Sequence, residues 1–280
     1  MLVTHSGRFH ADEIFATAMV LMIQDHDIIR TRDEEIIAKA DIVLDVGAEY
    51  IPEKNRFDHH QNSFTRERKD GTPFATAGLI WEHYGSEIFK AKNLTDDYEI
   101  QFAINWVDQK IISDIDAVDN GMFSEDPRPS ISLIIAMMNE KSTADEEAQQ
   151  AAFNKALVFT TDILNNFINS AITEARVIIE LEAAVKNVTD GILILEENLS
   201  FKDFLRSQPH IKRVVYPRND EVYGVFCNTQ INHLPEKLRG LRSEELNQVT
   251  GLTDTVFCHK SGFMAVCESL ESALIIARMD

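Results

Sequence analysis

Histidines and aspartates gather in four short segments of this chain, a pairing of residue types that is typical of metal centres. The segments are His5-x4-His10-x-Asp12, Asp45-Val46-Gly47, Asp58-His59-His60-Gln61 and Asp116-x2-Asp119-Asn120-Gly121. Imidazole and carboxylate ligands together suit Mn²⁺, Fe²⁺ or Zn²⁺, whereas Ca²⁺ prefers a cage of oxygen atoms. A carboxylate that bridges two such ions holds them about 3.5–4 Å apart, a separation that can clamp a phosphoryl group. The residue types therefore indicate metal-dependent phosphoryl chemistry.

Each segment taken alone also has a structural explanation. A single histidine is more often a hydrogen-bonded structural residue, and both Asp45 and the segment around Asp119 are typical of turns. The run Asp58-His59-His60 is harder to explain in this way, because two imidazoles and a carboxylate are costly to bury without partners. The occurrence of four such segments in one chain favours a metal site.

The first hundred residues alternate strand-like and helix-like runs, which predicts how these side chains are positioned. Strands are expected at 2–5, 27–31, 42–46 and 56–58, and helices at 11–24 and 75–84, the second ended by Gly85. This alternation predicts an α/β fold with a mostly parallel sheet and helices on both faces. Such sheets bind ligands beyond the carboxyl ends of their strands. Since His5, Asp45 and Asp58 stand at three of these ends, we expect them at one edge, with Asp45 in the bridging position.

A helical connector and a second domain are expected beyond this sheet. Residues 96–187 look helical almost throughout, and from 144 onward the apolar spacing predicts one long helix or two helices broken near Asn165. The turn-rich cluster 187–191 is the expected domain boundary. Strand-like runs return at 192–195, 213–216, 222–227, 255–258 and 263–267, with helix-like runs at 243–248 and 270–278. We therefore expect a catalytic domain with its helical connector at 1–187 and a smaller α/β substrate-binding domain at 188–280.

Charge and composition limit the classes of function. The 280 residues carry 27 lysines and arginines against 46 aspartates and glutamates, a formal net charge of −19. So acidic a chain is a poor match for sequence-independent duplex binding, which uses a basic surface. The longest apolar-rich stretch, 14–23, is shorter than the ~20 residues that cross a bilayer, so no membrane association is expected. Three cysteines without CxxC spacing and a start without signal-peptide features favour the cytoplasm.

Seven strings of the sequence resemble those of one known family. They are THSGRFHADE (4–13), DVG (45–47), FDHHQ (57–61), AGLIW (77–81), DAVDNG (116–121), LPEKLRGL (234–241) and HKSGF (259–263). In these strings, which follow in order over nearly the whole chain, the sequence resembles the Myg-type metal-dependent hydrolases. That family is in turn similar to the Asp-His-His (DHH) phosphoesterase superfamily. The resemblance implies a DHH-like catalytic domain that binds two divalent ions, most often manganese, with magnesium, iron or zinc as alternatives. Eukaryotic members of the family are described as 3′–5′ RNA exonucleases, so the resemblance also implies this activity.

The resemblance also implies roles for individual residues. One ion would be held by His5, His10 and Asp45, and the other by Asp12, Asp45, His59 and Asp119, with Asp116 as a competitor of Asp119. Asp58 would orient His59 and fix its tautomer. His60 would face the scissile phosphate and donate a proton or hydrogen bond while a metal-activated water attacks phosphorus in line.

The remaining substrate charge requires cationic side chains. Arg66 and Arg68 follow the FDHHQ string, and Arg239, His259 and Lys260 lie in the two C-terminal strings. The leading hypothesis is a cytoplasmic metal-dependent phosphodiesterase that acts as a 3′–5′ exonuclease on single-stranded RNA or short oligonucleotides. The alternatives are hydrolysis of a small phosphorylated molecule, such as pyrophosphate or a dinucleotide, and a non-catalytic metal-binding protein. A homodimer formed through residues 130–187 is a further hypothesis.

Overall fold

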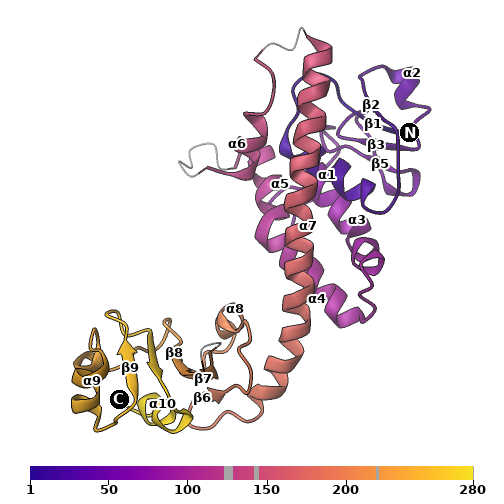
Figure 1. Ribbon diagram of the computed structural model, residues 1–280. Coiled ribbons are helices and arrows are strands. Elements are labelled where there is room, and N and C mark those ends of the chain that lie inside the picture. Colours follow the sequence, from indigo (N-terminus) through magenta and orange to yellow (C-terminus); the bar gives the residue numbers. More distant parts are fainter. Residues whose placement is uncertain (123–128, 142–144, 219–220, 280) are drawn as a thin grey trace. The chain divides into compact units, whose positions relative to one another are not determined.

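The computed structural model describes residues 1–122, 129–141, 145–218 and 221–279 (Figure 1). The chain divides into two compact units, Met1–Ala175 and Arg176–Asp280. The division falls inside the long helix α7 (Glu146–Val185), whereas the sequence places the boundary at the turn that follows this helix. Each unit contains a five-stranded sheet, so the mixed α/β class expected from the sequence is confirmed.

The first sheet has the strand order β2-β1-β3-β5-β4. Its strands are β1 (Leu2–Thr4), β2 (Ile28–Arg30), β3 (Ile42–Leu44), β4 (Tyr50–Ile51) and β5 (Arg56–Phe57). The strands β2, β1, β3 and β5 run parallel, and β4 joins β5 as an antiparallel edge. Because β1, β3 and β5 are neighbours in the sheet, the residues that follow them meet at one edge.

Alternating apolar residues give this sheet two buried faces. Leu2, Leu44 and Phe57 belong to the large core formed with α1 (Ala11–Leu21) and α3 (Thr76–Ala91). Val3 and Val43 point to the opposite face and pack with Ile36 and Ile37 of the short helix α2 (Glu34–Ile37). The two-residue period of a strand produces this division. It fixes the sheet between two layers of helices and leaves the carboxyl edge open.

Helix α3 runs six residues beyond Gly85, where the sequence predicts its end. A Cβ atom at Gly85 would lie 3.5 Å from side-chain atoms of Trp81 and Ile104. The glycine therefore stands at the packing contact between α3 and α4 (Asp97–Val107), and tertiary packing outweighs its weak helix propensity. The helix ends at Ala91, with Lys92 as its C-cap.

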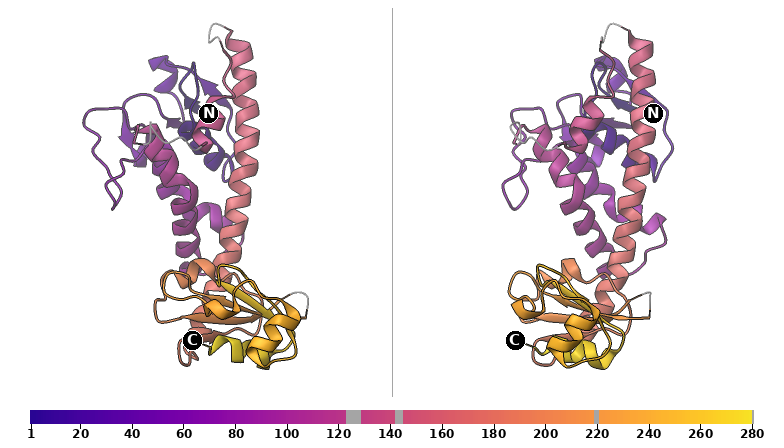
Figure 2. Two further views of the ribbon diagram at one scale, coloured as in Figure 1. Left: turned by 90° about the vertical axis from the view of Figure 1, so that its left-hand side faces the viewer. Right: turned by 60° about the vertical axis from the view of Figure 1, so that its left-hand side comes forward.

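The other helices of the first unit follow α3 in the sequence. A π-helical turn, η2 (Asp108–Ile112), joins α4 directly to α5 (Ser113–Asp119), and α6 (Ile131–Ala136) precedes α7. Helix α7 has 40 residues. Two further views show it as one unbroken helix (Figure 2). It continues through Asn165, so the single-helix alternative is correct. No helix in the described residues is long and apolar enough to cross a membrane.

The second unit contains the sheet β6-β7-β8-β10-β9. Its strands are β6 (Ile192–Ile194), β7 (Arg213–Pro217), β8 (Tyr223–Cys227), β9 (Thr255–Cys258) and β10 (Met264–Cys267), and its helices beyond α7 are α8 (Lys202–Leu205), α9 (Ser243–Thr250) and α10 (Leu270–Ala277). Only the β6–β7 pair of these described strands is parallel. The three cysteines are free and buried in this unit, as their apolar strands predict.

Candidate metal centre

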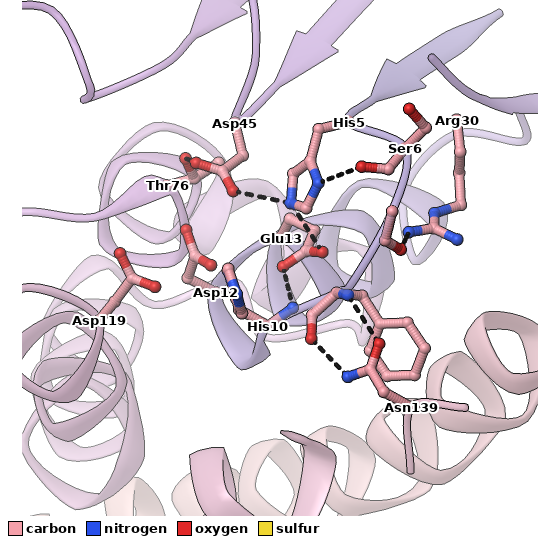
Figure 3. A network of polar contacts seen from close by, with 12 residues as sticks. His5, Ser6, His10, Asp12, Glu13, Arg30, Asp45, Thr76, Asp119 and Asn139 are labelled. Carbon is pink, nitrogen blue, oxygen red and sulfur yellow. Dashed lines mark hydrogen bonds and ion pairs between the residues drawn. The ribbon is translucent and has the colours of Figure 1, made fainter. Parts of the chain in front are cut away.

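The carboxyl edge of the first sheet brings together side chains from five parts of the first unit. His5 follows β1, Asp45 is the residue after β3, and His59 follows β5. Asp12 and Glu13 come from the first turn of α1, and Asp119 is the last residue of α5. Figure 3 shows His5, Asp12, Glu13, Asp45 and Asp119 converging from these elements. The structure thus gathers candidate ligands that lie far apart in the sequence.

One group of possible ligands surrounds His5. The donor atoms of His5, His10, Glu13 and Asp45 all lie within 4.8 Å of one another. The His5 Nε2 atom is 3.0 Å from Glu13 Oε1 and 3.4 Å from Asp45 Oδ2. Glu13 Oε2 also accepts a hydrogen bond of 2.7 Å from the His10 backbone N–H.

Glu13 is a possible ligand that the sequence analysis leaves without a role. Its position three residues after His10 is that of a capping-box carboxylate, and the structure gives it this function at the start of α1. One carboxylate oxygen caps the helix and the other faces His5. Because the N-cap is His10 instead of Ser or Thr, the sequence displays neither the usual capping pattern nor a ligand role for Glu13.

A second group surrounds His59. Its Nε2 atom is 3.3 Å from Asp119 Oδ2, 3.4 Å from Asp45 Oδ1 and 3.8 Å from Asp12 Oδ2. Asp45 therefore faces His59 with one oxygen and His5 with the other. Thr76 Oγ1 donates a hydrogen bond of 3.1 Å to Asp45 Oδ1 and holds this carboxylate in place. The arrangement is the one that a bridging carboxylate requires.

Burial makes the charges of this cluster interact strongly. Burial raises the pKa values of Asp12 and Glu13 above their ordinary range. Burial also opposes the ionisation of Asp45, but hydrogen bonds from His5 and His59 outweigh it and hold the pKa of Asp45 low. Burial would lower the pKa values of these two histidines, yet their carboxylate neighbours raise both to about 10. In the absence of a metal, the imidazolium groups serve as the cations of the cluster.

The unsatisfied atoms of the cluster show that a cation fits here. Both carboxylate oxygens of Asp12 are buried without a hydrogen-bond partner, and Oε1 of Glu13 and Nε2 of His59 have only the ion-pair contacts described above. Such an atom costs about 1–3 kcal/mol when it is left unpaired. Imidazole nitrogen and carboxylate oxygen are together a suitable donor set for Mn²⁺, Fe²⁺ or Zn²⁺. The residues present therefore fit divalent metal ions.

Asp58 contacts a different histidine from the one expected. Its Oδ1 atom is 2.8 Å from Nδ1 of His60 and accepts the His60 backbone N–H at 3.1 Å, while Oδ2 accepts the Ala48 N–H at 2.6 Å. The sequence analysis assigns Asp58 to His59, but the chain turns after β5 and directs His59 into the cluster. The Asp58 carboxylate raises the pKa of His60, whose side chain is 61% exposed.

Asp116 and Asp119 occupy different environments. The fully buried Asp116 carboxylate accepts hydrogen bonds from Arg68 Nη2 at 2.7 Å and from the Gly78 N–H at 2.9 Å. Arg68 also pairs with Asp108 at 2.6 Å, and only 10% of its side chain is exposed. Burial raises the pKa of Asp116 and the Arg68 guanidinium opposes this rise. Of the two competing aspartates, only Asp119 lies beside His59.

The two arginines predicted to bind substrate are both engaged within the fold. Arg68 is held between Asp108 and Asp116, and Arg66 pairs with Glu82 at 2.8 Å and contacts the Tyr50 hydroxyl. The partners lie 16 to 48 residues away in the chain, so the sequence alone does not reveal the pairing.

The predicted substrate-binding residues of the second unit lie in two neighbouring strings. Arg239 Nε donates to the Leu234 carbonyl at 2.9 Å, and a Cβ atom on Gly262 would lie 2.6 Å from the same Nε. His259 Nδ1 is 2.8 Å from Ser261 Oγ, and Lys260 is exposed. The two C-terminal strings thus pack against each other within this unit.

Comparisons with known proteins identify the family of this chain. A family model for MYG1 exonucleases, described as an uncharacterised protein family (UPF0160), matches residues 1–280. The chain belongs to this family. The MYG1 protein of Dictyostelium discoideum is 33% identical over 99% of this chain and 94% of its own length. The human MYG1 exonuclease is 31% identical over 98% of this chain and 84% of its own length, and the MYG1 protein of Chlamydia pneumoniae is 32% identical over 96% and 92%. No solved structure matches the chain.

Proposed function

We propose that this chain is a metal-dependent phosphodiesterase that acts as a 3′–5′ exonuclease on single-stranded RNA or short oligonucleotides in the cytoplasm. The observation that carries the proposal is the position of Asp45 between two groups of histidines and carboxylates, among which the buried Asp12 oxygens lack hydrogen-bond partners. The printed names of the human, rat and mouse relatives, each called MYG1 exonuclease, support a nuclease. A DHH-like catalytic domain in the first unit is part of the proposal.

Two divalent ions, manganese in the first place, would be held by the two groups around Asp45. His5, His10, Glu13 and Asp45 would hold one ion, and Asp12, Asp45, His59 and Asp119 the other. When bound, these ions would supply Lewis acidity toward the phosphate and lower the pKa of the attacking water.

The chain itself supplies a proton donor beside this centre. The Asp58 carboxylate accepts the Nδ1–H of His60, which leaves Nε2 as the ring atom free to hold the second proton. Since Asp58 raises the pKa of His60, the protonated form is favoured toward neutral pH. The exposed His60 can then donate this proton to the leaving oxygen, a step that contributes typically ~10²–10⁴-fold to a rate.

Binding of the rest of the substrate is proposed for the second unit. Arg239 and the adjacent His259 and Lys260 come from the two C-terminal strings, which pack against each other in that unit. Phosphate groups distant from the reacting bond are the natural ligands of such basic side chains.

The first experiment is hydrolysis of a 5′-labelled single-stranded RNA by metal-stripped protein supplied with Mn²⁺. We expect a ladder that shortens from the 3′ end and disappears in Asp45→Ala and His60→Ala. Loss of Asp45 removes several kcal/mol of transition-state stabilisation, which corresponds to a rate decrease of ~10³-fold. Release of phosphate from pyrophosphate or a dinucleotide without RNA cleavage would assign the site to small molecules, and metal binding without hydrolysis would indicate a non-catalytic protein.

A further inference from the structure

A cleft extends from the candidate metal centre across the carboxyl edge of the first sheet. Its volume is about 1020 Å³. The lining residues that belong to the centre are His5, His10, Asp45 and His60. Pockets for small ligands typically measure ~300–1,000 Å³, so this cleft lies at the upper end of that range. It has room for more than the reacting phosphate group.

Three arginines line the cleft, and one of them, Arg56, donates to backbone carbonyls of Ala40, Lys54 and Asn55. The other two are Arg8 and Arg32. Arg8 lies in the loop after β1, and Arg32 lies in the loop between β2 and α2. Since the strand order is β2-β1-β3, the loop that carries Arg32 starts two strands away from Asp45. Two strand spacings amount to about 10 Å. A ligand that contacts both the centre and Arg32 must therefore extend along the sheet edge.

The guanidinium groups of Arg8 and Arg32 are available to a ligand. Both residues are exposed, and within the described parts of the chain neither side chain forms a hydrogen bond or an ion pair. Glu34 and Glu49 line the same cleft and pair with neither of them. In contrast, Arg68 is neutralised by two carboxylates.

The backbone on both sides of Arg8 is fixed by contacts from distant parts of the chain. The Asn139 side chain accepts the Phe9 N–H at 2.9 Å and donates to the Phe9 carbonyl at 2.8 Å (Figure 3). Gln149 and Arg30 both donate to the Gly7 carbonyl, at 3.1 Å and 2.6 Å. Arg8 therefore projects from an anchored loop, so little backbone conformational freedom remains to be lost when it binds a ligand.

The backbone around Arg32 is similarly fixed. The Thr31 N–H donates to the Thr4 carbonyl of β1 at 2.8 Å. On the other side, Asp33 caps α2, and its own N–H donates to Thr31 Oγ1 at 3.1 Å. Both arginines thus stand at defined places on the wall of the cleft, while their long side chains stay unpaired.

We propose that Arg8 and Arg32 bind non-scissile phosphates of a polynucleotide strand whose end lies at the metal centre. This inference rests on the proposed function and names its substrate class, a single strand of several nucleotides in preference to pyrophosphate or a dinucleotide. A free guanidinium binds a phosphate group through two parallel hydrogen bonds. The two arginines compensate locally for the carboxylates that otherwise repel a nucleic acid from this edge.

The test compares two substrate lengths in the Arg8→Gln, Arg32→Gln and doubly substituted proteins. With Mn²⁺ bound, kcat/KM is measured for a single-stranded RNA of eight nucleotides and for a dinucleotide. We expect the kcat/KM for the eight-nucleotide RNA, divided by that for the dinucleotide, to fall on the order of 10–100-fold in the double variant. Loss of charged hydrogen bonds predicts a decrease of this size. Lys39→Gln, which removes an exposed positive charge outside the cleft, is the matched control and should leave the ratio unchanged.

A second measurement needs no catalysis. Binding of the labelled eight-nucleotide RNA in EDTA is followed by fluorescence anisotropy over a range of salt concentrations. The slope of log K against log salt should decrease by about 1.4 in the double variant, since each lost contact to a single strand contributes about 0.7. Unfolding and Mn²⁺ titrations of each variant verify that the fold and the centre are intact.

The outcomes separate this inference from the proposed function. Equal losses for both substrate lengths, or none, would overturn the role of the two arginines even if the wild-type protein cleaves RNA. Conversely, the protein could bind RNA through Arg8 and Arg32 and cleave no oligonucleotide. That result would overturn the proposed function and support phosphate binding by the two arginines.

Discussion

Buried polar groups are treated differently in the two units of this protein. In the second unit, the buried Asn228 donates hydrogen bonds to the carbonyls of Leu205 and Ile211, and so holds the chain after α8 against β8. In the first unit, the equally buried Asp12 leaves both carboxylate oxygens without a hydrogen-bond partner, and one oxygen of Glu13 contacts only the His5 imidazole. Polar groups that are paired stabilise the fold, whereas a cluster of unpaired groups stabilises it only when a ligand is bound.

The same contrast exists within the first unit, only a few residues apart. Asp116 is paired with Arg68 and Gly78, and Asp119 faces His59 among other carboxylates. In the DAVDNG string, Asp116 thus stabilises the fold and Asp119 belongs to the candidate centre. The following predictions test this division, from the largest expected effect to the smallest.

Asp116→Asn should destabilise the protein, and Asp119→Asn should weaken metal binding. Breaking a buried ion pair costs about 3–5 kcal/mol, and we expect the lower end because Asp108 still pairs with Arg68. Urea unfolding and Mn²⁺ titration measure the two effects. Asp114→Asn, an exposed position on α5, is the control and should change neither. A reversed pattern, with metal binding lost in Asp116→Asn, would assign the ligand role to Asp116.

Mn²⁺ should stabilise the first unit selectively. At a concentration of 100 Kd, a ligand contributes about 2.7 kcal/mol, which for a unit of this size raises Tm by roughly 5–10 °C. Hydrogen exchange should slow in β1, β3 and α1, and stay unchanged in β7 to β10. Protection of both units to the same extent would show that the metal acts elsewhere.

The stabilisation by Mn²⁺ should increase between pH 6.5 and pH 8.5. The fold raises the pKa values of His5 and His59 to about 10, above the ~6.5 of the unfolded chain. Protonation of these histidines therefore stabilises the metal-free fold fully below pH ~6.5, and this stabilisation is lost as the pH rises toward 10. The raised pKa values of Asp12 and Glu13 act in the same direction. Metal ions displace these protons and remove the dependence. Thermal unfolding with EDTA and with Mn²⁺ at each pH gives the difference.

Asp58→Asn should reduce kcat by about 10–100-fold, the usual effect of removing a carboxylate that orients a functional histidine. Since Asp58 raises the pKa of His60, its loss should move the alkaline limb of the pH–rate profile to lower pH. If kcat decreases but the alkaline limb of the pH–rate profile does not move, Asp58 acts only by holding the backbone at Ala48 in place.

Two glycines of α3 should respond oppositely to alanine. A Cβ atom at Gly78 would stand 1.9 Å from Asp116 Oδ2, so Gly78→Ala should destabilise by about 1–3 kcal/mol through overpacking. At Gly85 the nearest atoms are 3.5 Å away, and Gly85→Ala should stabilise by up to ~1 kcal/mol through helix propensity. Urea unfolding of both variants measures the difference, and equal effects would mean that Asp116 moves freely.

The sequence predicts those parts of the site that local pattern determines. Apolar runs ended by His5, Asp45 and Asp58 identify the strand ends, and the parallel order of the sheet then brings these residues together. The pairing of Arg66 and Arg68 depends on Glu82 and Asp108, which approach only through the packing of α3 and η2, so no local pattern reveals it. The partner of Asp58 likewise depends on the turn after β5, which two-residue periodicity does not specify.

The anchors of the first loop have a consequence for the order in which this protein folds during synthesis. Asn139 and Gln149 hold Phe9 and Gly7 across separations of 130 and 142 residues. The emerging chain can pair β1 with β2 and β3 early, because those strands lie close together in sequence. The loop between His5 and His10 becomes fixed only after the start of α7 has left the ribosome. The nascent first unit therefore completes its sheet well before its candidate metal centre, and a chain cut before Asn139 would retain the candidate ligands but lack two contacts to the loop between His5 and His10.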